Sequence, residues 1–359
     1  MNPIVLITLI FACVGLVDRI FGGKKHLAVP MEQGFAQCGE LLIDICGVYV
    51  ITQNYTDIIS RWGNDFSFGR FDLAALVGSL LASDMGGYNL CKSITRDSLF
   101  GIYAGTVIAG TLGGLTSFFI PVYLGFIQGE DRTCMLKGFL YGLIVLPIPM
   151  FLSGILWGIP LEKLIINLLP VICICIILVW FLKRKPNRVL AVFQKMGNIM
   201  RFLIGVAFLW TVGALYFPEK FELNQELIQE TIVMIVKMTI NVSGALVIME
   251  LFQRLARNFL KKLENRLGIN QWSIMGFLIG MPTGIAILPI YHKMDDKGKV
   301  LNAAFCVSGH YMLGGQMALI AGMESNKHFA IYMINKAMGA LLAVTVALYM
   351  EKRGEVIHK

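Results

Sequence analysis

The sequence predicts an all-helical integral membrane protein that crosses the bilayer about eleven times. Hydrophobic residues make up 56% of its 359 residues and charged residues only 15%, whereas about 25% of a typical soluble domain is charged. The mean hydropathy of +0.69 arises from repeated apolar stretches of roughly 20 residues, the length that a helix needs to cross the hydrocarbon core. The net charge of +8 does not indicate a nucleic-acid partner, because the basic residues cluster in short loops between these stretches.

The apolar stretches define about eleven spans, and a count of ten to twelve fits the sequence. Pro147 and Pro149 fall inside the fifth span and Pro170 falls inside the sixth. We therefore expect kinked helices there, with the freed backbone groups satisfied by neighbouring helices. The predicted spans lie near residues 3–21, 35–56, 71–91, 98–127, 135–158, 163–182, 199–217, 230–252, 272–291, 300–322 and 328–350.

Charged loops indicate the orientation of the chain. Basic clusters at residues 183–201 and 254–266 are separated by two spans, so both can lie in the cytoplasm. The loop between them carries Glu219, Glu222 and Glu226, which suits the outside. The basic C-terminal tail also favours the cytoplasm, yet eleven spans would place it outside. One segment is therefore predicted to be re-entrant or miscounted.

The two halves of the chain resemble each other. Residues 45–51 align with residues 242–248 at an offset of 197, and the same offset places Gly87 on Gly284 and the first span on the seventh. By helix count the two halves would be parallel repeats, whereas a re-entrant segment would make them inverted. Internal repeats with interrupted segments at corresponding positions indicate the midplane binding site of a transporter.

A third match supports the division of the chain. The Leu-Gly-Gly sequence at 112–114 aligns with the same sequence at 313–315, at an offset of 201. The common order of the matches predicts two five-helix repeats joined by one linking helix and a basic cytoplasmic loop. The predicted units are residues 1–160, 161–198 and 199–359.

The third span contains a stretch that is unusual for a membrane helix. It places Asp84, Gly86, Gly87, Tyr88 and Asn89 deep in an otherwise apolar segment. A charge at that depth is costly and usually faces a cavity or pathway, and paired glycines permit a backbone bend. The alternative interpretation is a glycine kink with the carboxylate paired to a neighbouring helix. The repeat places this stretch opposite Gly280–Ile287, so we predict interrupted helices at the centre of the protein.

Other polar groups within the predicted spans are further candidates for a functional site. Glu40 and Asp44 share one face of the second span, and the repeat places Lys237 of the eighth span opposite Glu40. They form either a buried structural ion pair, or a cation pathway or proton-linked carboxylate. His310 in the tenth span is more typical of a packing residue, whereas Gln316, beside a glycine pair, is the stronger candidate for lining a pore.

Enzyme, metal and disulfide motifs are missing from the sequence. The eight cysteines form no CxxC pair, and most lie in apolar segments, where free thiols act as small hydrophobes. The sequence contains no H-E-x-x-H, Walker A or G-x-S-x-G motif. We therefore predict a protein that is not an enzyme and has no metal site and no cofactor.

Three stretches resemble the ethanolamine permease family of bacterial ethanolamine-utilization operons. The most specific is Leu-Leu-Ala-Ser-Asp-Met-Gly-Gly at residues 80–87, and the supporting stretches are residues 32–35 and 298–305. The resemblance covers most of the chain in order. The chain departs from it at Glu40 and Asp44, where the family has small apolar residues, and near Gly315 and Gln316, where the family has an Asp-His pair. These departures indicate a divergent member.

The resemblance implies a multi-pass protein of the bacterial inner membrane that takes up ethanolamine for degradation in a microcompartment. Asp84, with Tyr88, would recognise the ammonium group, and the hydroxyl would bind a polar side chain. The alternatives are a transporter or channel for another small amine or cation, and a membrane sensor or scaffold. The predicted partners are ethanolamine and the lipid bilayer, and a homo-oligomer is compatible with the sequence. The predicted substrate-binding residues are Ser83, Asp84, Gly86, Gly87, Tyr88, Asn89, Thr283, Gly284 and Gln316, beside a charge network of Glu40, Asp44, Lys237 and His310.

Overall fold

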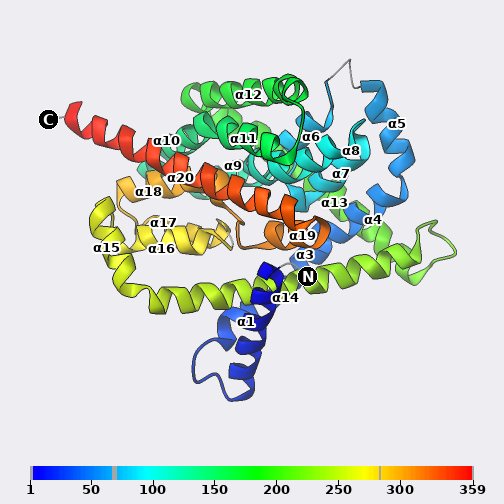
Figure 1. Ribbon diagram of the computed structural model, residues 1–359, viewed down its shortest axis with the longest axis horizontal. Helices are drawn as coiled ribbons and strands as arrows, with labels where there is room; N and C mark the ends of the chain where they lie inside the picture. Colours follow the sequence, from blue (N-terminus) through cyan, green and yellow to red (C-terminus); the bar gives the residue numbers. More distant parts are fainter. Residues whose placement is uncertain (1–2, 67–70, 283, 358–359) are drawn as a thin grey trace.

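The computed structural model describes residues 3–66, 71–282 and 284–357, and every regular element in that part of the chain is helical (Figure 1). Eight helical stretches are long and apolar enough to cross a membrane, and they coincide with eight of the predicted spans. This confirms an all-helical, multi-pass membrane protein. The eight stretches are Pro3–Ile20, Ala28–Asn54, Ser98–Phe126, Gly129–Trp157, Leu161–Arg184, Pro186–Tyr216, Gln225–Leu255 and Asn326–Lys352.

The first half of the chain contains many short elements, because several of its helices change pitch or break. The elements are α1 (Pro3–Ile20), α2 (Ala28–Ala36), α3 (Cys38–Leu41), η1 (Leu42–Cys46), α4 (Gly47–Asn54), α5 (Thr56–Phe66), α6 (Ala74–Leu80), η2 (Ser83–Met85), α7 (Gly87–Ile94), α8 (Ser98–Tyr103), η3 (Ala104–Gly113), η4 (Leu115–Phe119), α9 (Ile120–Phe126), α10 (Gly129–Val145) and α11 (Pro147–Trp157). The wide π-helical turns η1, η3 and η4 lie inside two of the long helical stretches.

The second half has longer helices and two central breaks. Its elements are α12 (Leu161–Arg184), α13 (Pro186–Tyr216), α14 (Gln225–Leu255), α15 (Arg257–Leu267), α16 (Gln271–Gly280), η5 (Gly284–Ile287), α17 (Leu288–Tyr291), α18 (Asp296–Gly309), α19 (Gly315–Met323) and α20 (Asn326–Ile357). The long helices α14 and α20 run across the view in Figure 1.

Three of the eleven predicted spans are not continuous helices. The span predicted at 71–91 is divided into α6, η2 and α7, and the one at 272–291 into α16, η5 and α17. The span at 300–322 breaks between the end of α18 at Gly309 and the start of α19 at Gly315. The count of eleven helices is therefore not confirmed. The physical reason is that glycine and proline residues interrupt these apolar runs, and hydropathy alone does not register the interruption.

Two of the broken segments are hairpins whose arms lie side by side. The Sγ atom of Cys91 in α7 donates a hydrogen bond to the carbonyl of Ala74 at the start of α6, at 3.3 Å. Likewise, the Nδ2 atom of Asn270 before α16 donates to the carbonyl of Lys293 after α17, at 2.8 Å. With a rise of about 1.5 Å per residue, arms of this length are too short to cross a core about 30 Å thick. Each segment has the geometry of a re-entrant hairpin.

The two hairpins enter from opposite ends of the molecule. The first hairpin (α6–α7) lies toward the right of the view and the second (α16–α17) toward the left (Figure 1). The C-terminus lies at the same end as the basic helix α15 (Figure 1). Because the second hairpin returns to the side from which it starts, the basic tail and the basic cluster at 254–266 can share the cytoplasmic side. This removes the conflict that a count of eleven spans creates.

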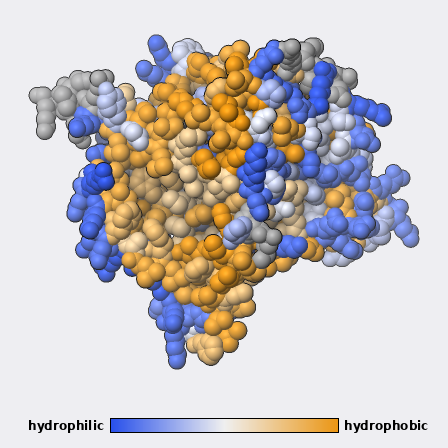
Figure 2. Space-filling model, viewed as in Figure 1, coloured by the Kyte–Doolittle hydropathy of each residue, from blue (hydrophilic) through white to orange (hydrophobic). Residues whose placement is uncertain are grey.

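The surface has the distribution that a bilayer requires. Figure 2 shows apolar side chains over the middle of one face, with polar side chains gathered toward its left and right ends. Large hydrophobic side chains are exposed on the long helices, among them Leu169 on α12, Leu209 on α13 and Leu341 on α20. Such an extended exposed apolar surface is typical of contact with lipid.

Reciprocal contacts join the two halves of the chain. Gly47, in the second predicted span, packs directly against the backbone of α13 at Phe208. Gly244, which aligns with Gly47 in the repeat, packs directly against the backbone of α1 at Thr8. The second span of each half thus contacts the first span of the other half. The division into two repeats stays a prediction, and these contacts are those that a two-fold relation would produce.

The re-entrant geometry of the second hairpin predicts that the segments before and after it lie on the same side of the membrane. In a chain whose native cysteines are replaced, single cysteines at Lys262 and Lys293 should both resist a membrane-impermeant maleimide in intact cells and react in inverted vesicles. A cysteine at Glu219, in the acidic loop, should show the opposite pattern and serves as the control. Labelling of the Lys293 position from outside would show that residues 271–291 cross the membrane.

Candidate functional site

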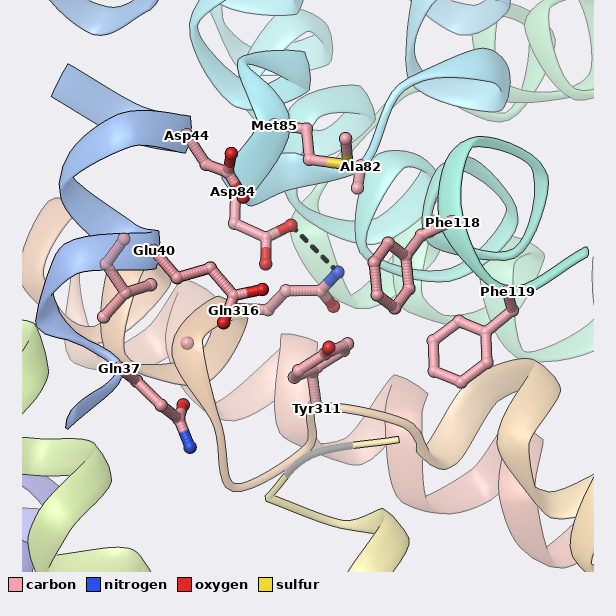
Figure 3. A pocket seen from close by; sticks show the side chains of 13 residues that line it. Gln37, Glu40, Asp44, Ala82, Asp84, Met85, Phe118, Phe119, Tyr311 and Gln316 are labelled. Carbon is pink, nitrogen blue, oxygen red and sulfur yellow. Dashed lines mark hydrogen bonds between the residues drawn. The ribbon is translucent and has the colours of Figure 1, made fainter. Parts of the chain in front are cut away.

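A small polar cavity lies where the tip of the first hairpin meets the break between α18 and α19 (Figure 3). Its volume of about 60 Å³ is several times the roughly 10–15 Å³ that one water molecule needs. It therefore has room for a ligand of a few heavy atoms. The lining residues are Gln37, Glu40, Leu41, Asp44, Ala82, Asp84, Met85, Gly114, Phe118, Phe119, Tyr311, Gly315 and Gln316.

The backbone of the first hairpin presents Asp84 to this cavity. Leu81 and Ala82 are extended, so α6 ends before the single turn η2 that carries Asp84. Gly86 follows with φ of +87°, a left-handed conformation that favours glycine, and a side chain there would collide with Val48. Gly87 packs directly on the carbonyls of Leu81 and Ala82. Both glycines are therefore needed for the bend that exposes the carboxylate.

Gln316 is the direct partner of Asp84. Its Nε2 atom donates a hydrogen bond to Oδ1 of Asp84 at 3.2 Å (Figure 3). Gln316 lies in the first turn of α19, which begins at Gly315, and a Cβ atom on Gly315 would lie 3.9 Å from Oδ2 of Asp84. The positive end of the α19 dipole is thus close to the carboxylate, which favours its negative charge.

The other end of Gln316 contacts a buried lysine that the sequence interpretation missed. The Nζ atom of Lys336 on α20 donates to Oε1 of Gln316 at 2.9 Å and to the carbonyl of His310 at 2.8 Å. Lys336 has no exposed surface. A lysine inside the last apolar span was the available signal, because ionisable residues at that depth are rare and functional. Asp84, Gln316 and Lys336 form one hydrogen-bonded chain.

Two further carboxylates face the cavity from the second predicted span. Glu40 in α3 and Asp44 in η1 line it together with Asp84 (Figure 3). The π-helical turn η1 shifts the helix face locally, and such turns frequently lie at functional sites. Three carboxylates around one small cavity repel one another and favour a bound cation. Within the described part of the chain, no three His, Cys, Asp or Glu side chains are placed to hold a metal ion.

Aromatic rings form the opposite wall of the cavity. Phe118 and Phe119 come from η4, and Tyr311 comes from the break after α18, where its φ is +49° (Figure 3). The rings of Phe118 and Tyr311 meet edge to face at 6.0 Å. An aromatic face attracts a cation within about 6 Å. Nothing in the sequence distinguishes the residues of this wall from ordinary apolar residues.

The tip of the second hairpin packs behind the aromatic wall. The hydroxyl of Tyr123 donates to the carbonyl of Gly284 at 2.6 Å, and a side chain on Gly284 would collide with Phe119. The backbone N–H of Leu313 donates to the carbonyl of Met281 at 3.0 Å. Gly284 thus supports the site from outside the cavity lining, and Thr283 lies outside the described residues.

Several other predicted residues lie elsewhere. Ser83 donates to the carbonyl of Gly105 at 2.8 Å and fixes the hairpin tip. Tyr88 donates to Oε1 of Glu324 at 2.5 Å. Asn89 is buried, and among the described residues its Oδ1 atom has no hydrogen-bond partner.

The predicted charge network is only partly assembled. Lys237 is exposed on α14, where it lines a surface groove with Glu226 and Glu230 away from Glu40. His310 is fully buried, and its ring packs against Phe119 with 4.2 Å between ring centroids. Among the described residues, Lys336 is therefore the cation that hydrogen bonds connect to a cavity carboxylate, because Gln316 bonds to both Lys336 and Asp84.

The fold and the cavity define a multi-pass membrane protein with a small carboxylate-lined cavity between broken helices, an arrangement typical of transporters. The family model described as "Ethanolamine utilisation protein, EutH" matches residues 1–350, and the chain belongs to this family. This confirms the resemblance found in the sequence. Two of the relatives named below carry the name of a permease, so the chain is assigned to a transporter class and not to the enzymes.

Curated relatives match nearly the whole chain at low identity. The "Probable ethanolamine permease EutH" of Listeria monocytogenes is 26% identical over 98% of this chain and 94% of its own length. The protein of the same name from Salmonella typhimurium is 25% identical, with 97% and 95% covered. The "Uncharacterized protein YxeR" of Bacillus subtilis is 26% identical, with 97% and 94% covered. No solved structure matches the chain.

Replacing Gly86 by alanine should destabilise the protein. A left-handed alanine costs about 1–2 kcal/mol, and its Cβ atom would also collide with Val48. Gly39→Ala in α3 is the matched control, since no heavy atom lies within 4 Å of its Cβ position and alanine favours a helix by about 1 kcal/mol. Thermal unfolding of the purified proteins should show a lower midpoint for Gly86→Ala only. Equal midpoints would contradict the assigned backbone of the hairpin tip.

Proposed function

We propose that the chain takes up ethanolamine, as the protonated amine, across the bacterial cytoplasmic membrane and binds it at Asp84. The observation that carries the proposal is the half-buried carboxylate of Asp84 at the tip of a re-entrant hairpin, in a small cavity that it shares with Glu40 and Asp44. The names of the relatives support the substrate. The cavity volume of about 60 Å³ suits a ligand of only a few heavy atoms, such as a small amine.

The lining groups match the two ends of a small amino alcohol. The ammonium group would bind Asp84 with charge-assisted hydrogen bonds and face the ring of Tyr311 or Phe118. The hydroxyl would reach Gln316, whose amide lies in the same cavity (Figure 3). Ser83 and Tyr88 already bond to Gly105 and Glu324 and are better placed to hold the hairpin than to bind the substrate.

We further propose that the two halves, residues 1–160 and 199–359, are inverted repeats joined by residues 161–198. Three observations support this arrangement: the opposed hairpins, the reciprocal packing of Gly47 and Gly244, and the contacts of each hairpin tip with the other half. Inverted repeats around a midplane site are typical of carriers that expose the site alternately to the two sides. The substrate would then bind in the cavity beside the first hairpin tip and leave on the opposite side.

The membrane potential can drive this uptake without a second ion. Moving one positive charge inward across a negative-inside membrane gains about 2.3 kcal/mol per 100 mV. The second candidate is a carrier for another small amine, which Glu40 and Asp44 favour because they add negative charge to the cavity. Competition by unlabelled amines against labelled ethanolamine in proteoliposomes distinguishes the two, since the true substrate should compete at the lowest concentration.

Asp84→Asn should strongly weaken saturable uptake of labelled ethanolamine at neutral pH. Removing one partner of a buried charge pair costs about 2–5 kcal/mol, so the KM should rise at least tenfold. Glu219→Gln, in the predicted outer loop, is the control and should transport like the wild type. The measurement is initial uptake by proteoliposomes with equal amounts of folded protein. Wild-type kinetics in Asp84→Asn would refute the assignment of Asp84, and uptake that never saturates in the wild type would indicate a channel.

A further inference from the structure

Lys336 is a buried cation without a direct carboxylate partner among the described residues. Its ammonium donates to two neutral oxygens, Oε1 of Gln316 and the carbonyl of His310. The ring of Tyr332 lies 5.7 Å from its Nζ atom. Burying a charge is costly unless it is paired, so an opposite charge close by has to stabilise this ammonium.

The carboxylate that fulfils this role is Asp84, which is linked to Lys336 through Gln316. The amide of Gln316 is oriented by both ends: its oxygen accepts from the ammonium, and its nitrogen donates to the carboxylate. The other ionisable groups around Lys336 are Glu40 and Asp44 across the cavity, the buried His310 and the phenol of Tyr332. His310 is held by the carbonyl of Cys306, and Tyr332 is neutral at physiological pH.

We infer that Lys336 is a tethered ammonium that competes with the ammonium of the substrate for Asp84, so that substrate binding displaces one proton from Lys336. This inference rests on the proposed function, because it takes a protonated amine as the substrate. In the empty protein, the ammonium of Lys336 balances Asp84. When a second ammonium binds Asp84 directly, two cations share the carboxylate that is linked to Lys336 through Gln316. Glu40 and Asp44 line the same cavity, but neither has a hydrogen bond to Gln316 or Lys336 among the described residues, so the buried Lys336 loses its counter-charge and gives its proton to water.

The step balances and has a defined role for Gln316. Its reactants are the Lys336 ammonium and the free substrate ammonium, and its products are the neutral Lys336 amine, the bound substrate ammonium and one aqueous proton. A neutral amine can accept a hydrogen bond. The amide of Gln316 then turns over, so that its Nε2 donates to Lys336 and its Oε1 faces the cavity. This turn frees Oδ1 of Asp84 and offers an acceptor to the substrate.

The inference fixes the sign of a pH effect on binding. Because binding releases a proton, the affinity for ethanolamine should rise as the pH rises, by up to about tenfold per pH unit. The carboxylates could produce the same sign, since they must be ionised to bind a cation. Lys336→Met separates the two origins, because it removes the tethered charge and keeps most of the side-chain volume.

The experiment is calorimetry of ethanolamine binding to the purified full-length protein in two buffers of different ionisation enthalpy. The wild type should release close to one proton per bound ethanolamine, and Lys336→Met should release close to none. Glu40→Gln and Asp44→Asn are the matched controls and should bind more weakly but still release the proton. Lys336→Gln is the second neutral variant if the methionine variant does not fold.

The outcomes separate this inference from the proposed function. If the wild type does not bind ethanolamine at any pH, the proposed function fails. If it binds ethanolamine without releasing a proton, the inference is overturned and the proposed function stands. The inference is likewise overturned if the folded Lys336 variants release as many protons as the wild type. Loss of proton release in Asp44→Asn with retention in Lys336→Met would assign the proton to Asp44 instead.

Discussion

Broken helices at membrane depth impose the constraint on which the rest of this structure depends. Each break frees backbone groups that lipid cannot satisfy, so protein must surround it. The N–H of Ala82 is satisfied by the hydroxyl of Ser117, and the carbonyl of Gly284 by the hydroxyl of Tyr123. The span Ser98–Phe126, which supplies Ser117 and Tyr123, is accordingly the most deeply buried of the long helical stretches. Both hairpin tips pack on this central helix.

The same enclosure determines which charges the centre can hold. Oxygen and nitrogen atoms that leave water need partners, and the cavity supplies them in a chain from Asp84 through Gln316 to Lys336. Glu40 and Asp44 add negative charge that this chain does not balance. The cavity is therefore a better environment for a small cation than for a neutral or negative solute, which is the physical basis for the proposed amine substrate.

The sequence predicted the features that depend on composition and local backbone chemistry. Runs of about 20 apolar residues located the eight long helices, and Asp84 beside Gly86 and Gly87 indicated the first break. Hydropathy could not distinguish a hairpin from a crossing helix, because the arms of residues 71–91 are as apolar as a span. Lys336 was overlooked because its role comes from contact with Gln316, 20 residues away along the chain and across a helix break.

The two hairpin tips differ in the polar groups that their described residues present. The first tip carries a carboxylate at Asp84, whereas the described residues of the second tip present backbone carbonyls at Met281 and Gly284, which Leu313 and Tyr123 satisfy. A second carboxylate there would face Glu40, Asp44 and Asp84 with only Lys336 nearby as a counter-charge. In the proposed arrangement, the two halves supply similar backbone breaks, and their side chains have diverged so that the first tip binds the cation at Asp84 while the second tip supports the site from behind.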